Sequence, residues 1–425
     1  MPYIAPNSPV ADWRCVPQGH GYGNYFDPVT GTWATVTRTT PKTARVAADK
    51  LVDVPAGYLA LEPWSLHKTG GVGLAAIIEE SRTNAYLDSY FAATDITAAW
   101  ASDGTLTRST DVPAVYGTHT AKVVLTGGAG DSNAIKTLLS QERPYSAAQN
   151  VTTSAWARGS ATGLTVQRFI EAIDASNAVL GTVVAGLTLG AWGHGTLTYA
   201  NLPTGTVKTR SGIRAIGVDE NDTVTLYASA AQSEVGSFAT SYIPTTTAAV
   251  TRNADVVTVP TTGWDAAAGT FVAVSGAPGG TSAWAAQMDW HKDQNNFLVL
   301  RHRYNNKGQT CTATGGVLVY ETSTTDMAYP CVHAGTYASG AACQDYRNGV
   351  SDAGTVSGTH STPTDMPAVG VVGRLGSDIY HWNGPIARVT VYASALTDEQ
   401  LAAADMTTDL LAGLDTARIT NEVTL

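Results

Sequence analysis

Short segments with a strand pattern recur along the middle of the chain, and they restrict the fold more than any other feature. Apolar and polar residues alternate within each segment with a period of two, the pattern of a half-buried β-strand. Turn residues such as Gly127-Gly128 separate the segments, and no helical period lies between them. This pattern predicts a β-sandwich rather than a parallel sheet with crossover helices. The predicted strands are Ala121–Leu125, Val151–Ala157, Leu164–Ala172, Thr182–Leu187, Gly195–Tyr199, Ser211–Val218 and Val224–Ala230.

The composition supports an all-β fold of more than one domain. At 425 residues the chain suits two or three domains, each with its own interior. Charged residues make up only 14% and there are 42 glycines, which favours strands and turns over long charged helices. The net charge is 25 − 35 = −10, so the chain has no basic field to attract nucleic acid. We therefore expect no nucleic-acid partner.

Membrane insertion and export by a signal peptide are both unexpected. No run approaches the roughly 18 apolar residues of a membrane-spanning helix. The opening sequence MPYIAPNSPVADW lacks the basic and then apolar pattern of a secretory signal.

The stretch Tyr227–Arg252 looks like the last strand of one sandwich followed by a stiff, extended passage into a second. Pro244 and the β-branched run Thr245–Thr247 disfavour helix there. The sequence AAQSEVGSFATSYIPTTTAAVTRNADVV resembles a segment of phage virion proteins of the head-spike and tail-fibre type. These proteins join a jelly roll similar to carbohydrate-binding modules to a laminin-G-like, or concanavalin-like, domain. The resemblance implies a component of the virion surface.

The second half of the chain resembles the laminin-G-like domain at several points. GTFVAVS, NFLVLRH, CVHAGTY, DYRNGV and VVGRLG are similar to its strands, and YHWNGPIARVTVYASALTDEQLAAA is the most specific match. Asn348-Gly349 and Asn383-Gly384 predict type I′ hairpin turns. Thr397 is expected to cap a short helix with Asp398 and Glu399 in its first turn.

We therefore expect an all-β protein with two jelly-roll β-sandwiches in tandem after an N-terminal attachment region. TWATVTR, residues Thr32–Arg38, resembles the opening strand of that region in the phage proteins. The alternative for this region is an N-terminal extension that packs on the next domain. The predicted divisions are 1–83 for the attachment or framework region, 84–245 for the jelly roll, 246–404 for the laminin-G-like sandwich and 405–425 for a C-terminal tail.

Aromatic side chains are the candidates for sugar contact, because the C–H face of a pyranose stacks on an aromatic ring. In the first sandwich Trp100, Tyr116 and Trp156 are also candidates, but a place in the core is an alternative for each, and Trp156, between Ala155 and Ala157 on a predicted strand, fits a core position better. Packing explains any one aromatic residue about as well as binding, so a cluster on one face is needed to favour binding. The selected residues are Trp192, Tyr199, Trp284, Trp290, Tyr304 and Trp382.

No catalytic motif is present, and we expect no enzymatic activity. The chain has no GxSxG elbow, HExxH, phosphate-binding loop or dinucleotide fingerprint. Glu79 and Glu80 are adjacent and would point to opposite faces of a strand, so a structural role is favoured. Glu171 with Asp174, and Asp289 with Asp293, are the candidate pairs of acids for glycoside hydrolysis, but such spacings are ordinary in loops.

Metal and cofactor sites are equally unsupported. Calcium needs about 6 to 8 oxygen ligands, and Asp289, Asp293 and Asn295 do not guarantee such a cluster. Cys15, Cys311, Cys331 and Cys343 lack zinc-site spacing, and buried or unpaired thiols are favoured. A single disulfide between two of Cys311, Cys331 and Cys343 is the alternative. We expect no cofactor.

Together these features predict a bacteriophage structural protein, made in the host cytoplasm and exposed on the virion surface as a fibre, spike or decoration. It is expected to adhere to host or environmental glycans, to contact other virion proteins and to form a homo-oligomer, with a trimer favoured because repetition raises avidity. One alternative is a purely structural decoration or tail component that binds no sugar. A second is a secreted bacterial carbohydrate-binding protein.

Overall fold

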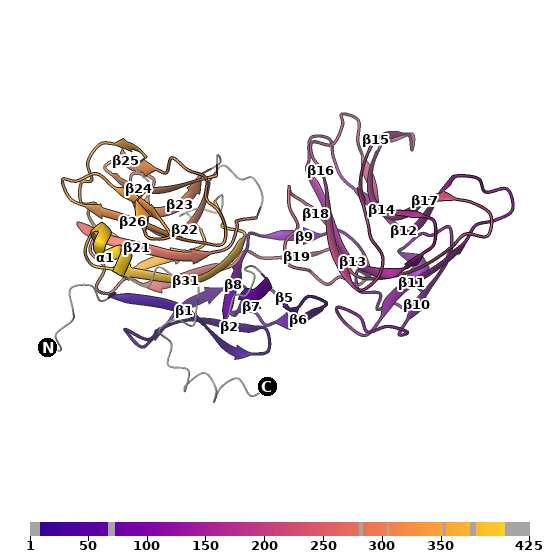
Figure 1. Cartoon of the computed structure of the whole chain (residues 1–425), viewed down its shortest axis with the longest axis horizontal. Coiled ribbons are helices and arrows are strands. Elements are labelled where there is room, and N and C mark those ends of the chain that lie inside the picture. The colour runs from indigo at the N-terminus through magenta and orange to yellow at the C-terminus, as the bar shows by residue number, and fades with distance from the viewer. Residues whose placement is uncertain are drawn as a thin grey trace. The chain divides into compact units, whose positions relative to one another are not determined.

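The computed structural model describes residues 9–66, 73–279, 284–303, 306–351, 354–374 and 380–403. The chain divides into two compact units (Figure 1). Unit 1 contains residues 1–46, 53–80 and 253–425, and unit 2 contains residues 47–52 and 81–252. Antiparallel sheets build both units, which confirms the all-β prediction. The helical pieces in the described ranges are η1 (Trp64–Leu66), η2 (Ile96–Ala98) and α1 (Asp398–Ala403).

Unit 2 is a sandwich of a five-stranded and a four-stranded sheet. The five-stranded sheet has the order β10 (Thr105–Ser109), β11 (Thr120–Thr126), β18 (Thr223–Val235), β13 (Val151–Ala161), β16 (Gly193–Tyr199). The four-stranded sheet has the order β12 (Ala134–Pro144), β17 (Lys208–Val218), β14 (Thr165–Ile173), β15 (Val179–Gly186). Apolar side chains from both sheets, including Leu139, Ala157, Ile213 and Leu226, meet in one core.

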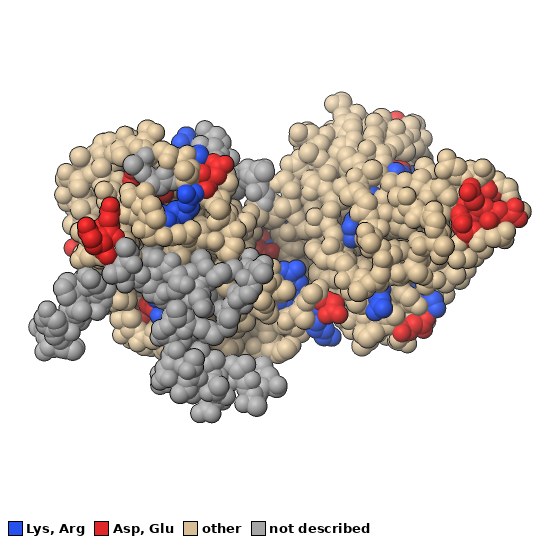
Figure 2. Space-filling model, viewed as in Figure 1, with Lys and Arg blue, Asp and Glu red and all other residues tan. Residues whose placement is uncertain are grey.

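Every strand predicted for this sandwich is confirmed, and β10 and β12 were missed. Strand β10 carries one large apolar residue, Leu106, so its alternation is weak. Strand β12 pairs with β17 through two register irregularities, one at Ala134/Ile135 and one at Thr137/Leu139. Each irregularity interrupts the period of two that sequence analysis depends on. On the face shown in Figure 2, an acidic group lies at one end of this unit, and the other charged side chains are scattered.

Unit 1 contains a ten-stranded and an eight-stranded sheet. The ten-stranded sheet has the order β1 (Ala11–Gly19), β2 (Tyr22–Asp27), β7 (Leu59–Pro63), β8 (Leu74–Ile78), β31 (Gly384–Tyr392), β21 (Ala268–Ser275), β26 (Cys331–Ala338), β27 (Gln344–Arg347), β28 (Val350–Ser351), with β3 (Thr32–Trp33) beside β2. The eight-stranded sheet has the order β29 (Thr355–Ser357), β25 (Val317–Thr322), β24 (Lys307–Thr314), β23 (Asn296–Arg303), β22 (Trp284–Asp293), β30 (Val369–Val372), β20 (Val256–Pro260), β4 (Thr35–Thr37). Two short pairs complete the described strands, β5 (Lys42–Ala47) with β6 (Lys50–Val54), and β9 (Arg82–Asn84) with β19 (Val250–Arg252).

Strands from the first 80 residues complete the sheets of unit 1, whereas residues 1–83 were predicted as a separate attachment or framework region. Strand β1 pairs with both β2 and β31, with Ala11 opposite Val391. Trp13 is 1% exposed within a core that also contains Val389 from β31. Sequence pattern alone does not reveal this pairing, because the partner strands lie at opposite ends of the chain.

The predicted opening strand Thr32–Arg38 is two strands. Strand β3 pairs with β2 in the ten-stranded sheet, whereas β4 pairs with β20 in the eight-stranded sheet. Between them the backbone N–H of Ala34 donates to the carbonyl of Tyr25. The chain therefore passes from one sheet to the other within this short segment.

The three predicted local signals of unit 1 have different outcomes. Asn348 and Gly349 both have positive φ, 49° and 78°, between β27 and β28, as a type I′ turn requires. Thr397 caps α1, since its Oγ1 accepts the backbone N–H of Gln400 at 3.3 Å. The prediction of a type I′ turn at Asn383-Gly384 was wrong, because Gly384 already belongs to the extended strand β31.

A buried ionic network in unit 1 explains Glu79. Lys42 Nζ lies 3.1 Å from a Glu79 oxygen and 2.7 Å from Asp255, which also pairs with Arg38 at 2.9 Å. The side chains of Lys42, Asp255 and Arg38 are 0% exposed. Removing one member would leave buried charge without compensation. This pairing supports the structural interpretation of Glu79. Among the described residues, no helix is long and apolar enough to span a membrane.

Candidate functional site

Two of the selected tryptophans lie in the core of unit 1. Trp290 is 5% exposed and Trp382 is 0% exposed. The indole nitrogen of Trp290 donates to the carbonyl of Pro367 at 2.8 Å, and that of Trp382 donates to Pro385 at 3.3 Å. Both lie in runs of buried residues, and neighbouring side chains cover both rings. Neither ring presents a stacking surface to solvent.

Trp284, the other selected residue of unit 1 that the structure describes, also gives no open aromatic face. Trp284 is half-buried at the start of β22, and Arg303 is its direct partner on β23. The guanidinium carbons of Arg301 and Arg303 lie 4.1 Å and 5.4 Å from the centre of the Trp284 ring. Such cation–π contacts occupy the ring faces that a sugar would need. Tyr304 lies outside the described residues.

Tyr199, selected in the first sandwich, packs against the interior of unit 2. It belongs to β16 and contacts a small core cluster of Tyr145, Val151, Ala172 and Leu202. A Cβ placed on Gly181 would lie 2.2 Å from the Tyr199 hydroxyl, so the ring lies tightly against β15. This position serves packing between the two sheets.

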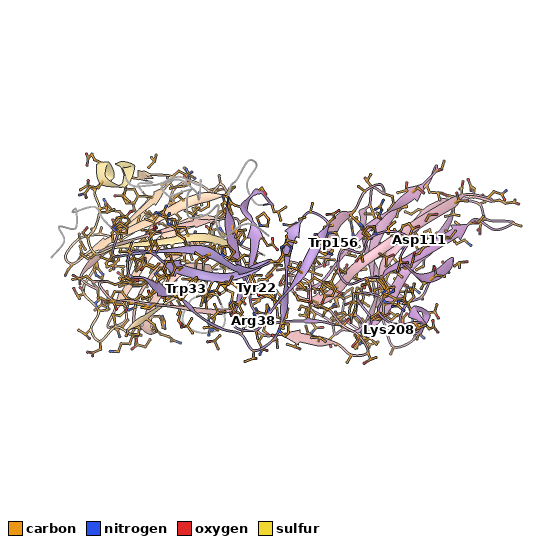
Figure 3. All side chains as sticks on the ribbon, turned by 90° about the horizontal axis from the view of Figure 1, so that it is seen from below. Tyr22, Trp33, Arg38, Asp111, Trp156 and Lys208 are labelled. Atoms are coloured by element: carbon orange, nitrogen blue, oxygen red, sulfur yellow. The ribbon has the colours of Figure 1, made fainter. Side chains whose placement is uncertain are left out.

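Trp192, in contrast, belongs to an aromatic cluster on the other side of the five-stranded sheet. We call this cluster the aromatic face and define it as Tyr90, Tyr116, Trp156, Trp192 and Tyr242. Its rings surround Leu51, Val115 and Ala230. Tyr90, Tyr116 and Trp192 are half-buried, so they combine a fixed position with exposed surface. Trp156, labelled in Figure 3, is the more deeply buried of the two tryptophans and is 5% exposed.

Ring contacts hold the aromatic face together. Tyr90 and Tyr116 meet edge to face with centroids 5.6 Å apart, and Tyr116 meets Tyr242 in the same way at 5.3 Å. The Tyr242 hydroxyl and Ser89 Oγ are 2.6 Å apart. Burial raises the pKa of Tyr242 well above its usual value. Tyr242 is therefore a neutral, fixed support beneath the exposed rings.

Hydrogen bonds fix the two indole rings. Trp192 Nε1 donates to the carbonyl of Pro113 at 3.1 Å, and Trp156 Nε1 donates to Ala48 at 3.3 Å. Since these donors are already used, the orientation of both rings is set before any ligand arrives. Such preorganisation reduces the entropy cost of binding.

A bulge in the sheet places Trp156 on this face. Ser154 of β13 pairs with Gln232, but Trp156 pairs with Ser229, so β18 contains an extra residue there. Ala230 on β18 has φ +50°, an unusual value for a residue other than glycine. Bulges of this kind commonly redirect side chains near functional sites. The backbone is therefore strained at Ala230, at the place where the aromatic rings gather.

Polar side chains border the aromatic rings. His194 is exposed and its ring lies 4.0 Å from that of Trp156, with an angle of 35° between the planes. The guanidinium of Arg158 lies 5.8 Å from the centre of the Trp192 ring. An aromatic surface with nearby hydrogen-bonding groups matches what a pyranose offers, an apolar C–H face rimmed by hydroxyls.

The sequence predicts only part of this cluster. Trp192 is among the predicted sugar contacts, whereas Tyr116 and Trp156 are candidates that are not among the six predicted residues. Tyr90 and Tyr242 were missed, because both lie in irregular segments without a strand pattern. The short spacing between Trp192 and His194 in the sequence LGAWGHG was the available signal, since His194 then lies on β16 opposite Trp156.

The acidic pairs considered for catalysis have other partners in the structure. Glu171 accepts from Arg210 at 2.6 Å and from Arg214 at 3.3 Å. Asp174 accepts the backbone N–H groups of Ser176 and Ala178 and closes a turn.

The acids considered for calcium are also hydrogen-bonded or buried. The four cysteines form no disulfide. Asp293 accepts the N–H of Asn295 at 2.8 Å, and Asp289 is 0% exposed. No group of three or more His, Cys, Asp or Glu that could hold a metal ion occurs within the described ranges. All four cysteines are free thiols.

No family model and no curated protein matches this sequence. Among solved structures, part of the chain is similar to tailspike protein 4 of bacteriophage CBA120, with a TM-score of 0.29, 12% identity, and coverage of 36% of this chain and 21% of that one. The carbohydrate-binding module TmCBM61, solved with β-1,4-galactotriose, gives a TM-score of 0.26, 14% identity, and coverage of 35% and 97%. CBM40 of the Ruminococcus gnavus IT-sialidase, bound to α2,6-sialyllactose, gives 0.27, 17%, and coverage of 34% and 85%. At these TM-scores the similarities are too remote to assign a function to this chain.

Proposed function

We propose that this chain is a non-enzymatic bacteriophage protein of the virion surface that binds glycans through the aromatic face of unit 2. The observation that carries the proposal is the gathering of Tyr90, Tyr116 and Trp192, all half-buried, on one side of the five-stranded sheet. Single exposed aromatic residues are common on protein surfaces, but a preorganised group of them indicates a binding site.

The rings and their neighbours suit a neutral sugar ring. Stacking on Trp192 or Tyr116 would use the C–H face of the sugar, and His194 and Arg158 would meet its hydroxyls. A site of this size has modest affinity by itself, so many copies on a particle would be needed for firm attachment.

The virion location rests on the resemblance of the segment after Ala230 to phage surface proteins. A non-enzymatic role is supported by the acids considered above, since Glu171 is held by two arginines and Asp174 closes a turn. Glycan adhesion needs no catalytic pair of acids. The aromatic face supplies the stacking surface that adhesion requires.

Titration of the full chain with a panel of oligosaccharides, followed by tryptophan fluorescence, tests the site. Trp192→Ala is expected to weaken binding about tenfold or more, because it removes a stacking surface together with its apolar area. Trp33→Ala is the matched control, since Trp33 is 43% exposed in unit 1 (Figure 3) and should leave affinity unchanged. An equal loss of glycan affinity in both variants, or an affinity that Trp192→Ala leaves unchanged, would reject the aromatic face as the glycan-binding site.

Labelling of intact particles with an antibody against this chain, viewed by electron microscopy, tests the location. Gold label on the particle surface is expected. Surface label without glycan binding would favour a purely structural component. Glycan binding by a chain missing from particles would favour a secreted carbohydrate-binding protein.

A further inference from the structure

Strand β15 (Val179–Gly186) is an open edge of the four-stranded sheet in unit 2 (Figure 1). On one side its backbone pairs with β14. Within the described ranges, no other strand pairs with Gly181–Gly186, and no loop donates a backbone hydrogen bond to this segment. Alternate N–H and C=O groups of the strand therefore point away from the sheet and are available to a further strand.

The edge strands β10 and β12, in contrast, carry features that discourage pairing with a further strand. Strand β12, the other edge of the same sheet, contains Lys136, Glu142 and Arg143 and ends at Pro144. Two register irregularities also interrupt its pairing with β17. Strand β10 is only five residues long and contains Arg108. Native proteins commonly block their sheet edges with such charges, prolines, bulges and short strands.

Strand β15 lacks most of these features. It contains no charged residue and no proline. The surrounding sequence from 175 to 207, which also includes β16, has no Asp, Glu, Lys or Arg. One extra residue, Leu180, interrupts the pairing with β14 near the start of the strand. The segment Gly181–Gly186 is therefore regular and uncharged, which makes it a suitable template for another strand.

An apolar side chain is exposed near the centre of this segment. Val184 is 47% exposed, and its direct partner on β14 is Phe169, which is 1% exposed. Apolar side chains therefore continue from the face of the sheet to its edge. The carboxylate of Glu171, opposite Thr182, lies 2.6 Å from Arg210, so its charge is already compensated. The chemistry of this edge suits an uncharged, β-forming partner strand.

We propose that β15 pairs with β15 of a second copy of this chain, antiparallel and about a two-fold axis at Val184. An antiparallel pair of identical strands is two-fold symmetric, so each copy supplies the backbone partners that the other lacks. Val184 then lies opposite the same residue of the second copy. The other pairs across the axis are also uncharged: Thr182 with Gly186, and Val183 with Ala185. No like charges meet there, although each chain has a net charge of −10.

This pairing defines the oligomer and is independent of glycan binding. A contact about a two-fold axis joins chains in pairs, whereas the trimer favoured from the sequence has no such axis and would leave β15 unpaired. Each pair of chains contains two aromatic faces, so pairing raises avidity for a repeating glycan without any new sugar contact.

Sedimentation velocity of the full chain over a wide range of concentration tests the proposal. The mass is expected to rise from that of one chain to that of two. Val184→Lys should weaken this association about tenfold or more, because it places two like charges opposite each other at the axis. Val124→Lys is the matched control. Val124 is 39% exposed on β11 in the other sheet, and its substitution should leave the association unchanged.

Hydrogen exchange of the unchanged protein locates the contact without any substitution. The amides of β15 should exchange more slowly as the concentration of the protein rises, because the second copy accepts their hydrogen bonds, while those of β10 should keep their rate. A single-chain mass at every concentration, a trimer, or a dimer that forms without slower exchange in β15 would overturn the proposal. Equal weakening of the association by Val184→Lys and Val124→Lys would also reject this edge as the contact.

Discussion

Four thiols show how burial sets the chemistry of single residues in this chain. Cys311, Cys331 and Cys343 are 0% exposed. Burial raises the pKa of Cys331 and Cys343 to about 12 and that of Cys311 to about 11. Since the thiolate is the reactive form, these residues are nearly inert at neutral pH.

We therefore expect an ordered pattern of thiol labelling. Burial raises the pKa of Cys15 to about 12 as well, so at pH 8 the folded protein should leave all four thiols largely unlabelled by a disulfide reagent, and Cys15, which is half-buried, should be the first to react on longer exposure. All four should react in denaturant. Mass spectrometry of labelled peptides measures this order. Rapid labelling of Cys331 in the folded state, or a disulfide among these residues in denaturant without reductant, would contradict it.

At the scale of secondary structure, a buried ion pair joins β1, the first described strand, to β31, the last described strand. Asp12 on β1 accepts from Arg388 Nε on β31 at 2.7 Å and from Thr390 Oγ1 at 3.1 Å. Burial alone would raise the pKa of Asp12, but the charges and hydrogen bonds of Arg388 and Arg14 lower it below its usual value. The carboxylate therefore stabilises the folded state in its charged form.

Asp12→Asn is expected to lower the free energy of unfolding of unit 1 by about 3 kcal/mol at neutral pH, because Arg388 loses its buried counter-charge. A lowered folded pKa gives stability above the unfolded pKa of about 4, and this stability is lost as pH falls through the folded value. The difference between the two proteins should thus disappear progressively below about pH 4. Urea unfolding across pH measures it.

Asp326→Asn is the control for this prediction. Asp326 pairs with Lys307 at the same distance, 2.7 Å, but its side chain is 67% exposed. Its loss should cost less than about 1 kcal/mol, since water screens such pairs. A cost for Asp12→Asn that persists unchanged at pH 2 would show that the carboxylate acts by packing, not by charge.

The same elements show how far sequence can predict this fold. Strands such as β11 and β17 were found because one side of each is buried, which imposes alternation on the sequence. The pairing of β1 with β31 was not found, because alternation reports a buried face and not the identity of a partner. Trp382 and Trp192 have similar glycine-containing surroundings in sequence, yet one is core and the other partly exposed. Only the tertiary arrangement separates them.

At the scale of the whole molecule, the chain leaves unit 1 at residue 46, returns at residue 53, and crosses again at 80/81 and 252/253. A short N-terminal segment therefore belongs to the unit built mainly from residues 81–252. Leu51, 5% exposed, lies in this segment. Its N–H donates to Val115 at 2.9 Å, and its side chain packs among the aromatic face.

Leu51 and Leu59 should consequently stabilise different units, although they are close in sequence. Leu59 is 0% exposed and packs in the core of unit 1. Leu51→Ala should destabilise unit 2, and Leu59→Ala unit 1, each by about 2–5 kcal/mol, because each opens a cavity in one core. Hydrogen exchange measured by mass spectrometry distinguishes the two. Faster exchange is expected in β13 and β18 for Leu51→Ala, and in β21 and β31 for Leu59→Ala. If Leu51→Ala instead accelerates exchange in β21 and β31 and leaves β13 protected, residues 47–52 belong energetically to unit 1, and the aromatic face does not depend on them.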